Sequence, residues 1–193
     1  FGKTLDTKVS FASLLRTLNE IEGIERIRFM TSHPKDISDE LIDAVAACDK
    51  VCEYMHLPVQ AGSSRLLKEM NRHYTRESYL EIIKKIKSKI PNATISTDLI
   101  IGFPGETEDD IDQLIELLKI VEYNSAFTFM YSPRKGTAAA EMTNQIDEDT
   151  KHERFNRVLE TLNGIIKENA KALKGQVMEV LVESISRKDE SVL

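Results

Sequence analysis

Residues 94–110 have the sequence TISTDLIIGFPGETEDD, and this stretch decides the fold class. The apolar run over 94–101 has the length and the β-branched content of a buried strand. Gly102 and Gly105 then mark a loop. Thr107 and Asp110 follow with capping-box spacing, with Asp in place of the usual Glu, and apolar residues continue at helical spacing to Leu118. The stretch therefore predicts a strand, a glycine-containing loop and a helix.

The same pattern recurs along the chain. Apolar runs over 27–32, 53–60 and 126–131 each end in a loop rich in Ser, Pro, Gly, Gln or Asn, and helical patterns with candidate caps alternate with them. Such alternation favours right-handed crossovers and a parallel sheet, whose strand-to-helix loops share one rim. The helical pattern at 11–21 has no strand before it. We therefore predict an α/β fold with parallel strands, an array of βα units that the chain enters partway.

The pattern changes after Asp147. Residues 147–175 predict one long bridging helix, even though Gly164 lies inside it. Residues 176–183 then alternate like a strand, and a single strand is not a stable domain. The predicted organisation is the βα array over 1–146, the long helix over 147–175, and the severed start of a further domain over 176–193.

Composition limits the class of protein. The net charge of −6, from 26 basic and 32 acidic side chains, argues against a protein that coats nucleic acid nonspecifically, although a local basic patch stays open. No apolar run approaches the ~20 residues of a membrane span. Two Cys without a secretory signal fit a reducing, cytoplasmic setting.

Cys48 and Cys52 resemble the first half of a C-x3-C-x2-C cluster motif, but the third position holds Met55. Two thiolates do not normally hold a four-iron cluster, so buried or half-buried structural thiols are the better interpretation, and no metal site is predicted. His56 lies inside an apolar run and is expected to be a hydrogen-bonded core histidine. For His33, on the rim, a structural role and a ligand contact are equally favoured.

Polar residues at the rim are candidates for ligand contacts. Asp98 interrupts an apolar strand, which predicts either a satisfied structural hydrogen bond or a contact to a cofactor. Tyr131 and Arg134 follow another strand, where the alternatives are a solvated turn and a site for an adenine ring and an anionic group. Each of these signals is weak when taken alone.

Together the motifs resemble the MiaB-type tRNA methylthiotransferases, which are radical S-adenosylmethionine (SAM) enzymes. The segments that carry the resemblance are IERIRF at 24–29, SHPKD at 32–36, HLPVQAGS at 56–63, MNRHYT at 70–75, TDLIIGFPGET at 97–107 and FTFMYSPRKGT at 127–137. The resemblance runs from about Phe11 to the end of the chain. It implies a partial TIM-like (β/α) barrel with parallel strands, truncated at its N-terminal side, whose last four strands lie over 1–146. A small RNA-binding β-domain called TRAM would follow, with 176–193 as its opening strand.

The resemblance also implies cofactors and partners. SAM and 4Fe-4S clusters would carry the chemistry, the clusters being bound by upstream segments absent from this chain, so this part would be inactive alone. The substrate would be C2 of an N6-isopentenyl-type adenosine in tRNA, with an electron donor protein as a further partner. No catalytic residue is expected in this chain. The residues expected to contact the cofactor or the substrate base are Gln60, Ser63, Asp98, Ile100, Gly102, Tyr131 and Arg134.

Other functions stay open as alternatives. The substrate could instead be a ribosomal protein aspartate or another modified adenosine, but 60–63 and 131–134 look like the tRNA group. An ordinary βα-barrel enzyme on a phosphorylated metabolite would need the loop at Gly102 to bind phosphate, where Glu106 places an acid. A non-catalytic RNA-binding module fits the acidic balance poorly. A homodimer through an exposed barrel edge is a further hypothesis.

Overall fold

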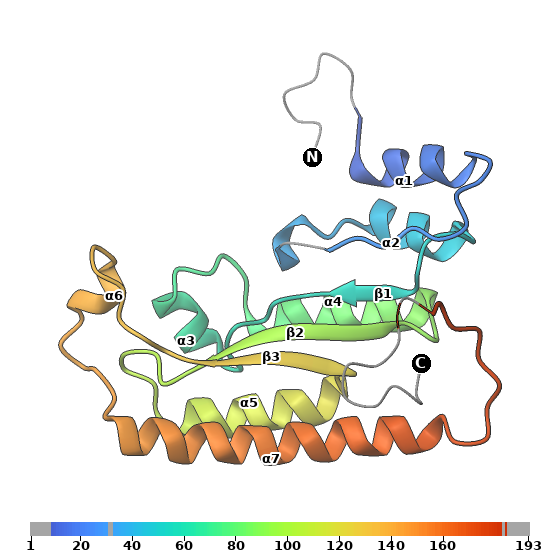
Figure 1. Ribbon diagram of the computed structural model, residues 1–193. Helices are drawn as coiled ribbons and strands as arrows, with labels where there is room; N and C mark the ends of the chain where they lie inside the picture. Colours follow the sequence, from blue (N-terminus) through green and yellow to red (C-terminus); the bar gives the residue numbers. More distant parts are fainter. Residues whose placement is uncertain (1–8, 31–32, 183, 185–193) are drawn as a thin grey trace.

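The computed structural model describes residues 9–30, 33–182 and 184. The described part of the chain contains seven α-helices, one short 3-10 helix and a three-stranded sheet (Figure 1). The strands are β1 (Tyr54–His56), β2 (Thr94–Ile101) and β3 (Ser125–Met130). The helices are α1 (Phe11–Asn19), η1 (Pro34–Asp36), α2 (Asp39–Ala47), α3 (Ser64–Glu69), α4 (Arg76–Lys89), α5 (Glu108–Val121), α6 (Ala138–Glu141) and α7 (Glu148–Ala172).

The sheet is parallel, in the order β1-β2-β3, as the alternating pattern predicts. Asp98 pairs with Phe127 and Ile100 pairs with Phe129, so these side chains share one face of the sheet. The alternate residues of β2, including Leu99 and Ile101, are fully buried, whereas Asp98 and Ile100 are half-buried. One face therefore packs into the core and the other stays partly open, which is the arrangement of a partial α/β TIM-like fold.

Helices α4, α5 and α7 run along the sheet, and α1 and α2 stack beyond β1 (Figure 1). Helix α7 contacts α5, β2 and β3, and α2 lies between α1 and α4. The predicted cap Thr107 is confirmed, because its hydroxyl accepts a hydrogen bond from the backbone amide of Asp110. Ser38, Ser63 and Thr75 cap α2, α3 and α4 in the same way. The predicted long helix is also confirmed as α7, with Gly164 inside it.

Two clusters of apolar side chains hold the fold together. The larger one lies between the sheet and the helices, where the buried hydroxyls of Tyr79 and Tyr123 lie 2.8 Å apart. The smaller one gathers Ala61, Leu66, Leu67 and Phe103 at the carboxyl ends of the strands. Helices α3 and α6 and the loop after β2 lie at this same end of the sheet (Figure 1). We call the loops at this end the rim.

One strand prediction is wrong over the described residues. In the run at 27–32, Ile27 forms an isolated parallel bridge with Val51, and 28–30 are in no strand. Phe29 packs edge-on against Phe11 instead of extending the sheet, which has three strands where four were predicted. Residues 31 and 32 lie outside the described residues.

The segment after α7 is in no strand over its described residues, and the predicted opening strand of a further domain stays a prediction. Residues 176–182 form no strand, and their apolar side chains are exposed, Val177 and Val180 among them. A strand needs a neighbouring strand to pair with, and the described sheet of β1, β2 and β3 does not include these residues. None of the described helices is long and apolar enough to cross a membrane.

Candidate functional site

A cleft of about 450 Å³ lies at the carboxyl ends of β2 and β3. Its walls combine polar and apolar side chains: Gln60, Asp98, Ile100, Phe129, Met130, Tyr131, Ser132, Arg134, Thr137 and Ala139. The cleft brings together five of the seven predicted ligand contacts, namely Gln60, Asp98, Ile100, Tyr131 and Arg134. Ser63 and Gly102 are not among its walls.

Gln60 has a strained backbone, with φ of 70° in the left-handed region that side chains other than glycine seldom adopt. Its amide donates to the carbonyl of Asp98 at 2.9 Å, and its carbonyl accepts from the amide of Ile100 at 2.9 Å. The side chain is 8% exposed and lines the cleft. Strain of this kind gathers at functional sites, where surrounding contacts hold it in place.

Asp98 lies between the cleft and the polar side chains of His56 and Ser96. Its carboxylate is 3.5 Å from Nε2 of His56, whose Nδ1 lies 2.8 Å from the hydroxyl of Ser96. The prediction that His56 is a hydrogen-bonded core histidine is confirmed. The carboxylate of Asp98 contacts His56 and also lines the cleft, and its contact to a cofactor stays a prediction.

Tyr131 forms one wall of the cleft and is fixed from the rim side. Its ring meets Phe103 edge-on at 5.4 Å, and the ammonium of Lys151 lies 5.9 Å from the ring centroid. Lys151 also donates to the carbonyl of Tyr131 at 3.3 Å. The buried hydroxyl of Tyr131 has no hydrogen-bond partner among the described residues. Arg134 is exposed, and its guanidinium forms no ion pair with any described residue.

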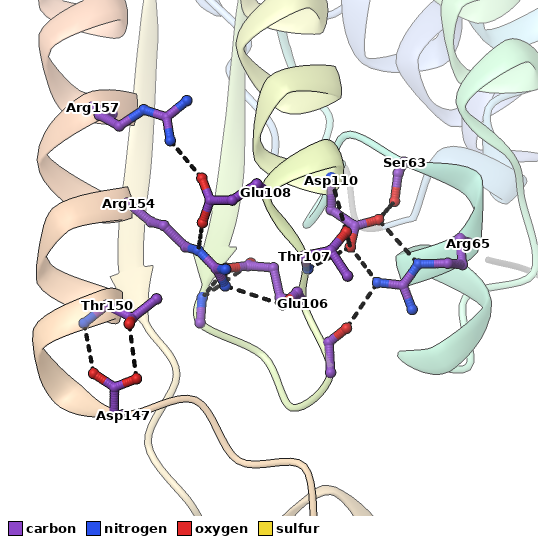
Figure 2. A network of polar contacts seen from close by, with 12 residues as sticks. Ser63, Arg65, Glu106, Thr107, Glu108, Asp110, Asp147, Thr150, Arg154 and Arg157 are labelled. Carbon is purple, nitrogen blue, oxygen red and sulfur yellow. Dashed lines mark hydrogen bonds and ion pairs between the residues drawn. The ribbon is translucent and has the colours of Figure 1, made fainter.

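Ser63 lies below the cleft instead of in it. Its hydroxyl caps α3 by accepting from the amide of Leu66 at 3.1 Å, and it donates to the carboxylate of Asp110. Arg65 and Thr107 also bind Asp110 (Figure 2). Burial raises the pKa of Asp110, but Arg65 and the two hydroxyls outweigh it and hold the pKa at about 2. The side chain of Ser63 is therefore part of the support of the rim.

Gly102 is covered by α7. With φ of 79°, it takes a conformation that suits glycine, and a Cβ at this position would lie 2.5 Å from Cγ of Lys151. Its amide donates to both carboxylate oxygens of Glu106 at 3.0 Å. The Gly102 amide that a phosphate would need as a donor therefore already donates to the Glu106 carboxylate. This counts against the alternative of a βα-barrel enzyme that acts on a phosphorylated metabolite.

Glu106 belongs to a chain of ion pairs that joins the loop after β2 to α7 (Figure 2). Arg154 donates to the Glu106 carboxylate at 3.2 Å and to Glu108 at 2.6 Å, and Arg157 also binds Glu108. Burial raises the pKa of Glu106 to about 7, against the lowering effects of the Gly102 amide and Arg154. The helix predicted only as a bridge therefore also fixes the loop beside the cleft.

Lys151 and Arg154 were not predicted as site residues. Their spacing of three places them on one face of a helix, but nothing in the sequence indicates which loop that face meets. Buried positive charges need partners, and here Glu148 pairs with Lys151 at 2.8 Å. Glu148 is local to α7, whereas Arg154 pairs with Glu106 of the loop after β2, so this second pair depends on the fold.

The cysteines have the predicted structural character. Cys48 is buried and Cys52 is half-buried, and both are free thiols. Within the described ranges, no three His, Cys, Asp or Glu side chains gather as a metal site.

Comparison with known proteins decides the family. Residues 2–118 match the family model of the radical SAM superfamily. The chain belongs to that superfamily. It is 58% identical over its whole length to the tRNA-2-methylthio-N(6)-dimethylallyladenosine synthase of Clostridium botulinum strain Hall, and 61% identical over 191 residues to that of Clostridioides difficile. The predicted resemblance to MiaB-type methylthiotransferases is therefore confirmed. The chain spans 43% and 40% of these two relatives.

Solved radical SAM structures share the fold at low sequence identity. Coproporphyrinogen III oxidase (HemN) from Escherichia coli matches 72% of this chain and 32% of its own, with a TM-score of 0.61 and 16% identity. The radical SAM methyltransferase TsrM from Kitasatospora setae, solved with tryptophan and a SAM analogue, matches 80% of this chain and 40% of its own, with a TM-score of 0.51 and 15% identity. These likenesses support the partial barrel fold.

Proposed function

We propose that this chain is the part of a radical SAM tRNA methylthiotransferase that holds SAM and the target base, and that the enzyme methylthiolates C2 of an N6-isopentenyl-type adenosine. The cleft carries the proposal, because it gathers Gln60, Asp98, Tyr131 and Arg134 at the carboxyl ends of parallel strands. Ligands bind at this end of βα barrels. The names of the relatives at 58% and 61% identity supply the reaction class.

The cleft has the size and chemistry to fit SAM. A cavity of about 450 Å³ lies within the range of roughly 300–1,000 Å³ typical of small-molecule sites. The apolar side chains of Ile100 and Met130 suit an adenine ring. The carboxylate of Asp98 would accept hydrogen bonds from ribose hydroxyls or an ammonium, and the guanidinium of Arg134 would pair with a carboxylate. The unpartnered hydroxyl of Tyr131 is a further polar group for a ligand.

In this proposal the cofactors carry the bond-breaking and bond-forming steps of the reaction. SAM together with 4Fe-4S clusters would provide hydrogen abstraction from the base and transfer of the methylthio group. The clusters would be bound by segments outside this chain, so we expect the 193-residue chain to be inactive by itself. The residues described here would bind and orient SAM and keep water from it. None of them needs to act as an acid or a base.

Transfer RNA is the favoured substrate over a ribosomal protein aspartate. The motifs at 60–63 and 131–134 resemble the tRNA group, and the relatives are named for a tRNA product. Both motifs contribute side chains to the cleft, so the part that differs between the two groups also meets the ligand. Another modified adenosine stays the alternative within the tRNA group.

The remaining partners follow from the same proposal. An electron donor protein would reduce the cluster, and residues 176–193 would open a TRAM domain whose strand forms only with its neighbours. A tRNA-modifying enzyme would work in the cytoplasm. Strand β3 ends the sheet, so its outer edge could pair with a second copy as a homodimer. A monomeric mass by light scattering at micromolar concentration would contradict that homodimer.

The proposal is tested on the full-length protein with reconstituted clusters. We expect methylthioadenosine in digested tRNA by mass spectrometry, and SAM binding by equilibrium dialysis. Replacing Gln60 by Ala or Asp98 by Asn should weaken SAM binding by roughly tenfold each, the loss of about one hydrogen bond to a polar ligand. Gln113→Ala, a glutamine on α5 bonded to Asp109, is the matched control and should bind SAM normally. Unchanged SAM binding in both cleft variants would contradict the assignment of the cleft as the SAM-binding site.

A further inference from the structure

Two buried side-chain atoms lack a hydrogen-bond partner among the described residues, and both belong to the rim. They are Nε of Arg72 and the hydroxyl of Tyr131. Tyr131 packs on the small apolar cluster of the rim, and so does Tyr74, two residues after Arg72. Buried polar atoms in native proteins nearly always have partners, so each exception calls for an explanation such as a ligand. Two exceptions around one cluster point to a ligand at the rim.

The rim beside Arg72 gathers positive charge. The ring of His33 meets Tyr74 edge-on at 5.2 Å, and Nδ1 of His33 accepts from the amide of Lys35 at 3.2 Å. The pKa of His33 is lowered by its burial and then by the nearby charges of Arg72, Lys35 and His73, while Asp36 opposes them. Arg72 and Lys35 form no ion pair with any described residue. Positive charge therefore outweighs negative charge here.

The two cations Lys35 and Arg72 lie next to the cleft. The hydroxyl of Tyr74 donates to the carbonyl of Val59 at 3.0 Å, directly before Gln60 in the cleft wall. The other side of the cleft is bounded by Arg134 and followed by Lys135, both exposed. Lys135 likewise has no ion pair in the described part of the chain. Cations thus flank the cleft on both sides.

Cations elsewhere on the surface are often paired. Lys85 binds Asp39 at 2.9 Å, Arg76 binds Glu116 at 2.7 Å, and Arg157 binds Asp112 at 2.8 Å. The chain as a whole carries a net charge of −6. Unpaired cations on both sides of one cleft in an acidic chain are suited to an external anion.

We infer that Lys35, Arg72 and Lys135 form a phosphate track, which holds the backbone of the tRNA across the mouth of the cleft while the target base enters it. This inference rests on the proposed function and adds a binding surface within the barrel part, separate from the TRAM domain. Arginine and lysine bind phosphate oxygens directly, and each contact releases counterions from the nucleic acid. Phosphate contacts carry no sequence information, so the track fixes position and leaves choice of base to the cleft.

The test measures RNA binding by this chain as a function of salt concentration. The probe is a fluorescein-labelled anticodon stem-loop RNA with an N6-isopentenyl adenosine, followed by fluorescence anisotropy. Lys35→Gln and Lys135→Gln should each weaken binding severalfold and lower the slope of log affinity against log salt by about 1. The same loss is expected with a stem-loop carrying unmodified adenosine. Lys84→Gln and Lys119→Gln, exposed on α4 and α5, are the matched controls and should leave the slope unchanged.

Arg72 is tested by a conservative pair, since its side chain is half-buried. Arg72→Lys keeps the charge and should retain most of the salt slope, whereas Arg72→Met should lower the slope by about 1, with circular dichroism confirming that both fold. An unchanged slope in Lys35→Gln and Lys135→Gln, or an equal loss in the controls, would overturn the track. The absence of RNA binding by the unaltered chain at low salt would also overturn the track.

The full-length protein separates failure of the track from failure of the proposed function. If Lys35→Gln and Lys135→Gln leave the KM for tRNA unchanged while methylthiolation proceeds, the function stands and the track is wrong. If the track variants lose RNA binding but the unaltered protein never forms methylthioadenosine, the track stands and the proposed reaction is wrong.

Discussion

The carboxylate of Glu106 lies between the backbone amide of Gly102, at 3.0 Å, and the guanidinium of Arg154, at 3.2 Å. Glu106 is only 4% exposed, so burial raises its pKa to about 7 although both neighbours favour the charged form. One carboxylate thereby ties the end of β2 to α7, beside the wall that Tyr131 gives to the cleft. Its charge state changes within the neutral range.

Glu106→Gln should change how stability depends on pH. Between pH 4.5 and about 7, the folded chain keeps a proton on Glu106 that the unfolded chain has lost, so this group's contribution to stability falls as pH rises. Over that interval the unaltered chain should lose roughly 3 kcal/mol relative to the variant. Urea unfolding followed by circular dichroism at pH 5 and pH 8 measures the difference. Glu141→Gln, an exposed glutamate, is the control, and a difference that is constant with pH would contradict the shift.

Asp110→Asn should remove stability that is present above about pH 4. The pKa of Asp110 falls from 3.8 to about 2, so its contribution is complete above 3.8 and is lost as pH drops toward 2. Arg65 is 49% exposed, and solvent weakens its pair with Asp110, so we expect a loss of roughly 1–2 kcal/mol at pH 7. Asp109→Asn, the exposed neighbour, should cost less. Equal unfolding free energies for the two variants would rule out a special role for Asp110.

Gly62→Ala should destabilise the chain strongly. A Cβ at Gly62 would lie 2.1 Å from Cα of Leu114, and a backbone atom cannot rotate away as a side chain can. We expect a loss of about 2–4 kcal/mol from overpacking between the loop and α5. Gly164→Ala in α7 is the opposite case, because nothing lies within 4 Å, and should gain roughly 0.5–1 kcal/mol. Thermal unfolding of both variants measures the contrast, which a stable Gly62→Ala would refute.

Tyr131→Phe should leave stability unchanged or raise it slightly. The hydroxyl of Tyr131 is buried without a partner in the described structure, so removing it sacrifices no hydrogen bond there. Tyr79→Phe is the matched control, because that hydroxyl donates to the carbonyl of Leu57 at 3.0 Å and should cost about 1 kcal/mol. Chemical denaturation compares the two. A larger loss for Tyr131→Phe than for Tyr79→Phe would mean that the Tyr131 hydroxyl has a partner in solution.

Much of the site follows from residues close together in sequence. Asp98 and Tyr131 were candidates because each interrupts or ends an apolar strand, and parallel strands bring such positions to one rim. Gln60 and Ser63 were expected from the family resemblance, but the hydroxyl of Ser63 is used by the amide of Leu66 and by Asp110. A polar side chain is available to a ligand only if neighbouring residues do not already use its hydrogen bonds. The strand pattern does not show which neighbours do so.

The sequence by itself determined the order of strands and helices, because apolar periodicity and caps such as Thr107 with Asp110 act over a few residues. It also determined the family, through motifs whose spacing is visible in the chain. Only the tertiary structure decided that Gln60 is held in a left-handed conformation by β2, that Glu106 meets Arg154, and that the run at Ile27 makes one bridge instead of a strand. These features come from hydrogen bonds and packing between residues far apart in sequence, which exist only once the helices enclose the sheet.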